Sequence, residues 1–223
     1  MSNDQTAPRR FPPARDTFAG TIALRVAAAI DTRDALVEGF GDVDVPDVFP
    51  GETQPTPAEV ADLVDAVIAD HNEHVRRATP EAIQLLDAID GLPTRGLAVS
   101  FGEGGDDDAA LDAVVRSAGV AIGHGATVEG YCYSTSSDVA ELVAEGRLPM
   151  TYGVFAETGL SVAEVAERVR EVLGAQGLPV AEDDEERQRV VVAPVRWAVP
   201  FHGHALHEVA PPEDVEQRGR LSR

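Results

Sequence analysis

Apolar residues recur at helical spacing through residues 17–92. The stripes of this region are Phe18, Ile22, Val26 and Ile30, preceded by Asp16 or Thr17 as a cap, and then Val60, Val64, Val67 and His71. The second stripe follows Thr56-Pro57-x-Glu59, which has a capping threonine, a proline at the first helical position and a glutamate three residues after the cap. The same Thr-Pro-x-Glu opening precedes "AIQLLDAIDG". These patterns predict that residues 17–92 form a helical region.

Two stretches break this helical periodicity. Residues 1–16 are polar, contain proline and show no period, which predicts a disordered lead. Residues 41–57, "GDVDVPDVFPGETQPTP", place prolines among acidic residues and glycines. Such a composition is typical of a loop, so we expect an acidic, Pro-rich loop between the early helices and the helix that follows.

After Pro93 the pattern changes to short β-like runs that alternate with amphipathic segments. "RGLAVSFG" predicts a strand, and "DDDAALDAVVRSAG" predicts a helix whose acidic first turn suits the positive end of the helix dipole. "VAIGHG" and "GYCYSTS" predict two strands that form a hairpin, before a helix "SSDVAELVAEG" capped by Ser136 or Ser137. The strand "LPMTYGVF", the helix "SVAEVAERVREVLGAQG" and the strands "LPVAED" and "RVVVAPVRW" complete the series.

This order predicts an α+β fold, in which a helical N-terminal half is followed by a mixed sheet. The sheet would consist of two βαββ-like units with helices packed on it, over residues 93–200, followed by a flexible tail over residues 201–223. Laying the two units on each other aligns Gly119 with Gly177. True duplication and chance similarity both explain this match, since a glycine after a helix is common. A three-layer and an open two-layer arrangement both fit the pattern.

Charge and composition exclude several classes of function. The chain of 223 residues has a net charge of −21, which repels nucleic acid and anionic lipid. It contains no lysine, which excludes Schiff-base chemistry and a Walker A phosphate loop. The single cysteine gives no intramolecular disulfide, and the N-terminus carries no apolar signal segment. We therefore expect a cytoplasmic protein.

The only cysteine, Cys132, lies in "GYCYSTSSD" and raises the question of a nucleophile. In the predicted hairpin, the nearest histidine, His124, lies opposite Glu129, about 10 Å along the sheet from Cys132. The two side chains would also point to opposite faces. Strand alternation places Tyr131 and Tyr133 together on one face and Cys132 on the other, so the cysteine is interpreted as a small buried residue. We predict no catalytic residue.

The C-terminal "FHGHALHE" is the most metal-like cluster of the sequence. Its candidate ligands are His202, His204 and His207, since neutral imidazoles bind zinc, nickel or copper. Their spacing matches no helix or strand template, and the following residues resemble a disordered tail, so no cofactor is expected. His71 and His74 share a helix face, but His71 lies on the apolar stripe, which favours a structural role.

The second half of the chain resembles a family of uncharacterised actinobacterial proteins described as a domain of unknown function. The shared motifs, between about residues 107 and 197, are a Gly-Tyr-aromatic strand, a following aspartate, a Tyr-Gly strand end and a helix that leads to a Gly-Leu strand. Here they correspond to Gly130, Tyr131, Tyr133, Asp138, Tyr152, Gly153, Gly177 and Leu178. The chain lacks the cysteine cluster that we associate with the family, so no metal or redox role of those cysteines carries over.

Two hypotheses of function follow. The first is a non-enzymatic, protein-binding or regulatory module whose acidic surface covers a basic surface of a partner protein. The second is a small-molecule or metal-dependent enzyme. Its site would lie near Tyr131, Tyr133, Asp138 and Tyr152, with Arg147 as the group that binds an anion. The oligomeric state stays open.

Overall fold

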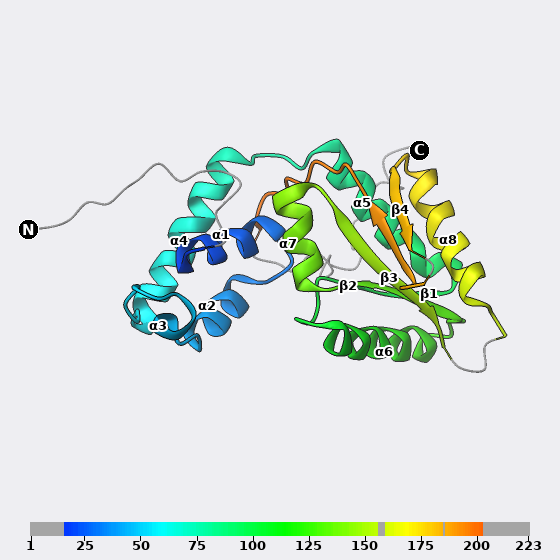
Figure 1. Ribbon diagram of the computed structural model, residues 1–223, viewed down its shortest axis with the longest axis horizontal. Helices are drawn as coiled ribbons and strands as arrows, with labels where there is room; N and C mark the ends of the chain where they lie inside the picture. Colours follow the sequence, from blue (N-terminus) through cyan, green and yellow to red (C-terminus); the bar gives the residue numbers. More distant parts are fainter. Residues whose placement is uncertain (1–15, 156–158, 185, 203–223) are drawn as a thin grey trace, which may run out of the picture.

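A computed structural model describes residues 16–155, 159–184 and 186–202 (Figure 1). Its N-terminal helices are α1 (Phe18–Ala28), α2 (Arg33–Gly41), α3 (Val45–Val48), α4 (Pro57–His74) and α5 (Pro80–Gly91), followed by a short 3-10 turn, η1 (Leu92–Arg95). The helical N-terminal half is thereby confirmed. The loop predicted over residues 41–57 is wrong in one part, because it contains α3. Val45 in α3 is fully buried, so core packing holds this short helix despite its proline.

The caps expected from the sequence are present at α1 and α4, whereas Thr79 before α5 makes no side-chain capping hydrogen bond. Thr17 caps α1, and its side chain accepts a hydrogen bond from the Gly20 N–H. At α4, Thr56 and Glu59 form a reciprocal capping box, in which each side chain accepts from the other residue's backbone N–H. Local sequence is sufficient here, because the donors and acceptors of a helix start lie within one turn.

The second half of the chain forms a five-stranded mixed sheet of order β1-β2-β3-β5-β4. Its elements are β1 (Leu97–Phe101), α6 (Asp107–Gly123), β2 (Gly130–Ser134), α7 (Ser136–Glu145), β3 (Leu148–Val154), α8 (Val162–Ala175), β4 (Val180–Asp184) and β5 (Arg189–Val192). β1 and β2 are parallel, whereas β3 is antiparallel to both β2 and β5. The α+β class is therefore confirmed.

The predicted hairpin of "VAIGHG" with "GYCYSTS" is wrong. Residues 119–123 continue α6, and β2 instead pairs with β1 in parallel, with Cys132 beside Val99. Gly119 does not adopt a left-handed conformation and is tolerated inside the helix, which ends before Gly125 at φ 84°. The first predicted βαββ unit is therefore not formed, while β3, α8, β4 and β5 do follow the order of the second.

Helices cover both faces of the sheet, so the arrangement has three layers. α6 packs on one face through a small cluster with Ala98 and Tyr133, and it lies below the sheet in Figure 1. α5, α7 and α8 contribute to the larger core on the other face, together with α1 and α4. This shared core joins the helical half to the sheet.

The extended segment after β5 ties the two halves together. Trp197 Nε1 donates to the Ala27 carbonyl in α1 at 3.1 Å, and the Val199 carbonyl lies 2.8 Å from His71 Nε2 in α4. Since a carbonyl only accepts, His71 carries its proton on Nε2. Burial lowers the pKa of His71, in agreement with the predicted structural role. Phe201, the first residue of the predicted tail, is buried.

In the part of the chain that the structure describes, no helix is long and apolar enough to cross a membrane.

Candidate functional site

The strand β2 separates its reactive-looking side chains onto two faces, as the alternation predicted. Tyr131 and Tyr133 lie on the α6 face with ring centroids 6.2 Å apart. Cys132 points into the core of the opposite face and is fully buried. Burial raises the pKa of the Cys132 thiol to about 12, so it stays protonated and is not a nucleophile at neutral pH.

The Gly-Tyr and Tyr-Gly motifs meet across the sheet. Tyr131 on β2 is paired with Gly153 on β3, and a Cβ atom at Gly153 would collide with the Tyr131 ring and hydroxyl. The glycine thus provides the space in which the tyrosine ring lies. In this chain, the two motifs therefore pack directly against each other across β2 and β3.

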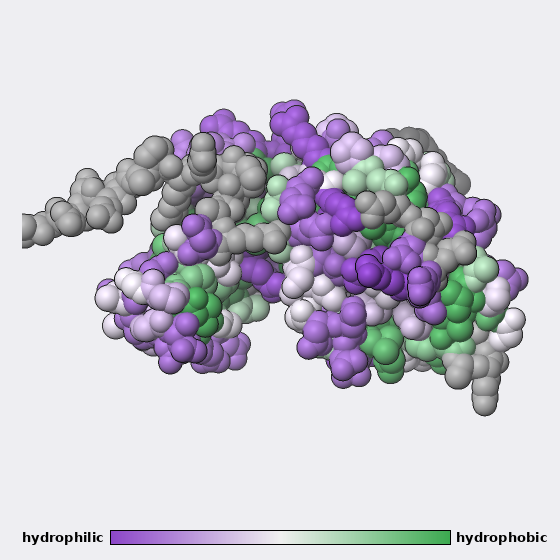
Figure 2. Space-filling model, in the orientation of Figure 1, coloured by the Kyte–Doolittle hydropathy of each residue, from purple (hydrophilic) through white to green (hydrophobic). Residues whose placement is uncertain are grey.

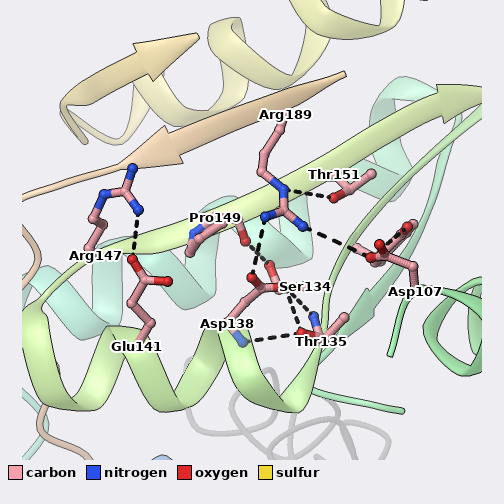
Figure 3. Close-up of polar contacts among 10 residues, drawn as sticks. Asp107, Ser134, Thr135, Asp138, Glu141, Arg147, Pro149, Thr151 and Arg189 are labelled. Atoms are coloured by element: carbon pink, nitrogen blue, oxygen red, sulfur yellow. Dashed lines mark hydrogen bonds and ion pairs between the residues drawn. The ribbon is translucent and has the colours of Figure 1, made fainter. Parts of the chain in front are cut away.

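A polar cluster lies where α6, α7, β3 and β5 converge on the α6 side of the sheet (Figure 3). Arg189 Nε donates to Thr151 Oγ1 at 3.3 Å, and its two terminal nitrogens lie 3.9 Å from carboxylate oxygens of Asp107 and Asp138. The Tyr133 hydroxyl donates to Asp107 Oδ1 at 3.1 Å. We call Asp107, Tyr133, Asp138, Thr151 and Arg189 the Arg189 cluster.

The Arg189 cluster has the chemistry of a structural network. Burial and the neighbouring Asp107 raise the pKa of Tyr133 to about 12, and burial also raises the pKa of Tyr131. Both phenols are therefore neutral at physiological pH. A neutral phenol between a carboxylate and a guanidinium orients a substrate only where open space adjoins it. Neither the cleft at the carboxyl ends of β1 and β2 nor the cavity along β1 is lined by these tyrosines.

Besides pairing with Arg189, Asp138 caps the start of α7. Its Oδ2 accepts from the Thr135 N–H at 2.8 Å, and Thr135 Oγ1 accepts from the Asp138 N–H, which forms a capping box. The predicted caps Ser136 and Ser137 are therefore wrong by one or two residues, because Thr135 is the last residue with an extended backbone. Asp138 is buried and serves the helix and the Arg189 cluster at once.

Two residues expected at the candidate site lie elsewhere. Tyr152 is paired with Cys132, is 1% exposed and belongs to the core on the opposite face of the sheet. Arg147 forms an ion pair with Glu141 at 2.7 Å, apart from Arg189 in Figure 3. The structure thus brings Tyr131, Tyr133 and Asp138 to one side, but not Tyr152 or Arg147.

The predicted metal ligands lie at or beyond the C-terminal end of the described residues. His202 is exposed, and His204 and His207 fall outside the described residues. Among the residues that the structure does describe, no group of three or more histidine, cysteine, aspartate or glutamate side chains is placed to hold a metal ion.

A cleft of about 440 Å³ opens at the carboxyl ends of β1 and β2. It is visible in Figure 2 as the recess between α2 and the start of α6. Its lining includes Arg25, Asp31, Gly105 and Ser136. α6 and α7 leave this edge toward opposite faces of the sheet, and such switch points bind ligands in open α/β sheets. The Gly-rich turn "FGEGG", between β1 and α6, forms part of this lining.

A second cavity, of about 310 Å³, lies along the free side of β1. We call it the β1 groove. It is lined by Leu86, Ile89, Asp90, Pro93, Val99, Ser100, Phe101, Glu103 and Ser117. β1 stands at the end of the strand order, and no strand among the described residues pairs with its other side. Ser100 is 4% exposed, and its hydroxyl oxygen has no hydrogen-bond partner among the described residues.

Exposed apolar side chains also lie on both helices that line the β1 groove. Ile83 on α5 is 48% exposed, and Val120 on α6 is 63% exposed. Helical spacing places Ile83 on the side of α5 that carries Leu86, and Val120 on the side of α6 that carries Ser117. The surface over α6 shows green, hydrophobic areas among purple ones in Figure 2. Both helices beside the groove thus expose apolar side chains.

Comparison with known proteins identifies the family. A family model described as "Domain of unknown function (DUF6891)" matches residues 12–200. Because this match covers most of the chain, the chain belongs to that family, and the predicted membership of a domain of unknown function is confirmed. No curated protein and no solved structure matches the chain.

Proposed function

We propose that this member of the DUF6891 family is a non-enzymatic module that binds another protein, in the cytoplasm. The observation that carries the proposal is the β1 groove, where a strand edge, an unpartnered buried hydroxyl and exposed apolar side chains lie together. Unpaired strand edges readily pair with other chains, so natural proteins usually cover or charge them. The wall residues Leu86 and Ile89 are apolar, and the two acidic residues of the lining, Asp90 and Glu103, favour a basic partner.

Charge supports a protein partner over nucleic acid or membrane. The net charge of −21 repels phosphate backbones and anionic lipids, whereas it attracts a basic protein surface. The Arg189 cluster supports a non-enzymatic role, because its side chains form hydrogen bonds and ion pairs with one another.

A site-specific photo-crosslinking experiment tests the proposal. The full chain carries a photoreactive side chain at Val120, beside the β1 groove, and is irradiated in a native extract. The matched control carries the same group at Val48, which is 58% exposed on α3, away from the groove. We expect one protein to be captured from Val120 and not from Val48, and to bind the purified chain stoichiometrically. Capture from neither position, or equally from both, contradicts the proposal.

The cleft between α2 and α6 favours a second function, the binding of a small molecule. Its Arg25 and Asp31 are ion-paired at 2.8 Å and present charges of both signs to the same space. A ligand that binds the folded state raises the melting temperature. Thermal-shift screening of metabolites and metal ions would therefore find it, and Gly105→Leu, which fills the cleft, should abolish the shift. Gly119→Leu on α6 is the control, since Gly119 also has open space around it.

A further inference from the structure

We propose that the β1 groove receives an extended segment of the partner protein, which pairs with β1 as an added strand and carries basic residues at the ends of an apolar stretch. This inference rests on the proposed function and names the kind of partner and its mode of binding. Three properties of the groove support it: its backbone, its walls and its charges.

The backbone of β1 offers hydrogen bonds to such a strand. The Glu129 N–H donates to the Gly96 carbonyl, and the Gly102 N–H donates to the Ser134 carbonyl. In a parallel pair, every second residue directs both its N–H and its C=O to the neighbouring strand. The even-numbered residues of β1 therefore face β2, and Val99 and Phe101 direct their backbone groups to the open side.

The two walls of the groove differ in chemistry. On the α5 side, Leu86 and Ile89 provide apolar contacts. On the α6 side, Ser100 and Ser117 provide hydroxyl groups, of which the Ser100 hydroxyl is buried and unpartnered. Because side chains of an added strand alternate between the two faces, apolar residues suit one face and small polar residues the other. Threonine or serine opposite Ser100 would satisfy its hydroxyl.

The charges at the groove select a basic partner over a second copy of this chain. Asp90 on α5 and Glu103 before α6 stand at the groove, where Glu103 also pairs with Arg116 at 3.7 Å, and the chain as a whole has a net charge of −21. A second copy would bring the same carboxylates against these ones, which is unfavourable. Arginine or lysine at the ends of the added strand would instead approach them.

A synthetic peptide provides the test. The probe has seven residues, with valine and threonine alternating between terminal arginines, and its binding to the full chain is measured by fluorescence anisotropy. We expect binding, slower hydrogen exchange of the Val99 and Phe101 amides, and about tenfold weaker binding when glutamates replace the arginines. Val99→Pro removes an outward N–H without removing a bond to β2, and should also weaken binding about tenfold. Val99→Ala retains the N–H and is its control.

The possible results are distinct. Equal binding to Val99→Pro and Val99→Ala, or no slower exchange at Val99 and Phe101, overturns strand addition. Concentration-dependent protection without peptide, with a dimer in sedimentation, overturns the basic partner in favour of a second copy. If crosslinking at Val120 captures a protein but the peptide neither binds nor protects β1, this inference fails while the proposed function stands. If crosslinking captures nothing, the proposed function fails.

Discussion

The Arg189 cluster and the β1 groove belong to the same sheet, and they differ in how their polar groups are satisfied. In the cluster, Arg189 and Tyr133 bond or pair with groups from α6, α7 and β3. In the groove, the Ser100 hydroxyl is buried without a partner, and the outer side of β1 is unpaired among the described residues. The tyrosine, aspartate and arginine side chains of the Arg189 cluster therefore hold this fold together. At the β1 groove, the Ser100 hydroxyl and the outer backbone groups of β1 have no partner among the described residues and are available for a ligand.

This difference changes where function is sought in such a chain. A cluster of tyrosine, aspartate and arginine attracts attention because these residues carry most catalysis and binding. Satisfied hydrogen bonds, however, leave little for a ligand, whereas unsatisfied backbone edges and buried unpaired hydroxyls are costly unless something binds them.

The largest expected difference is in the access of a thiol reagent. Native Cys132, buried and with a pKa of about 12, should react with iodoacetamide at pH 8 only when the chain unfolds. The variant Ser100→Cys in a Cys132→Ala background should react faster, because Ser100 lines the β1 groove although it is only 4% exposed, whereas Cys132 lies fully inside the core. Mass spectrometry measures both rates. Equal, slow rates would show that the groove is closed to solvent.

A second difference is how much extra side-chain volume a glycine position tolerates at the Tyr131 contact and on α6. Gly153→Ala places a Cβ atom against the Tyr131 ring and should destabilise the fold by about 1–3 kcal/mol. Gly119→Ala, where the surroundings are open, should be neutral or stabilising because alanine favours the helix. Urea unfolding measures both. The double variant Tyr131→Leu/Gly153→Ala should recover part of the loss, and strictly additive effects would contradict the proposed contact.

Much of the helical half was predictable from sequence because its determinants are local. The stripe of Val60, Val64 and Val67 and the box of Thr56 with Glu59 lie within neighbouring turns. The strand predicted for "VAIGHG", residues 120–125, was wrong because local sequence alone misplaced the end of the helix before it. A glycine after an amphipathic stretch suggests a helix end, and only the packing of Ala118 on the sheet and the non-left-handed Gly119 show that the helix continues.

The sites depended on contacts that sequence does not contain. Tyr131, Tyr133 and Asp138 were expected to lie together, since two alternate along one strand and the third follows it. Arg189 lies far along the chain and reaches them only because β5 is inserted beside β3. The β1 groove is even less visible in sequence, because "LAVSF" has no unusual residue and becomes an edge only through the strand order.

A third difference is the dependence of stability on a single cation. Arg189→Met removes the positive charge between Asp107 and Asp138 and should cost about 1 kcal/mol, a modest value because Arg189 is one-third exposed and screened by solvent. Arg187→Met is the matched control, since its ion pair with Asp184 is far more exposed and its loss should be nearly neutral. Denaturant midpoints compare them. Equal effects would mean that the Arg189 cluster is only a surface feature.

The smallest expected effect is a loss of folding stability at alkaline pH. It should come from Tyr133, at the centre of the sheet, and not from Ser100, at its edge. The pKa of Tyr133 is about 12 in the folded chain and 10.0 in the reference state. A raised pKa favours the protonated form on folding, so this contribution is complete below pH 10 and is lost as pH rises toward 12. Tyr133→Phe, which cannot ionise, should therefore lose less stability than wild type between pH 9 and 11 in urea unfolding. Ser100→Ala in the groove should keep the wild-type slope. If Tyr133→Phe also keeps the wild-type pH slope, the Tyr133 hydroxyl is solvated. The Arg189 cluster and the β1 groove then do not differ in how their polar groups are satisfied.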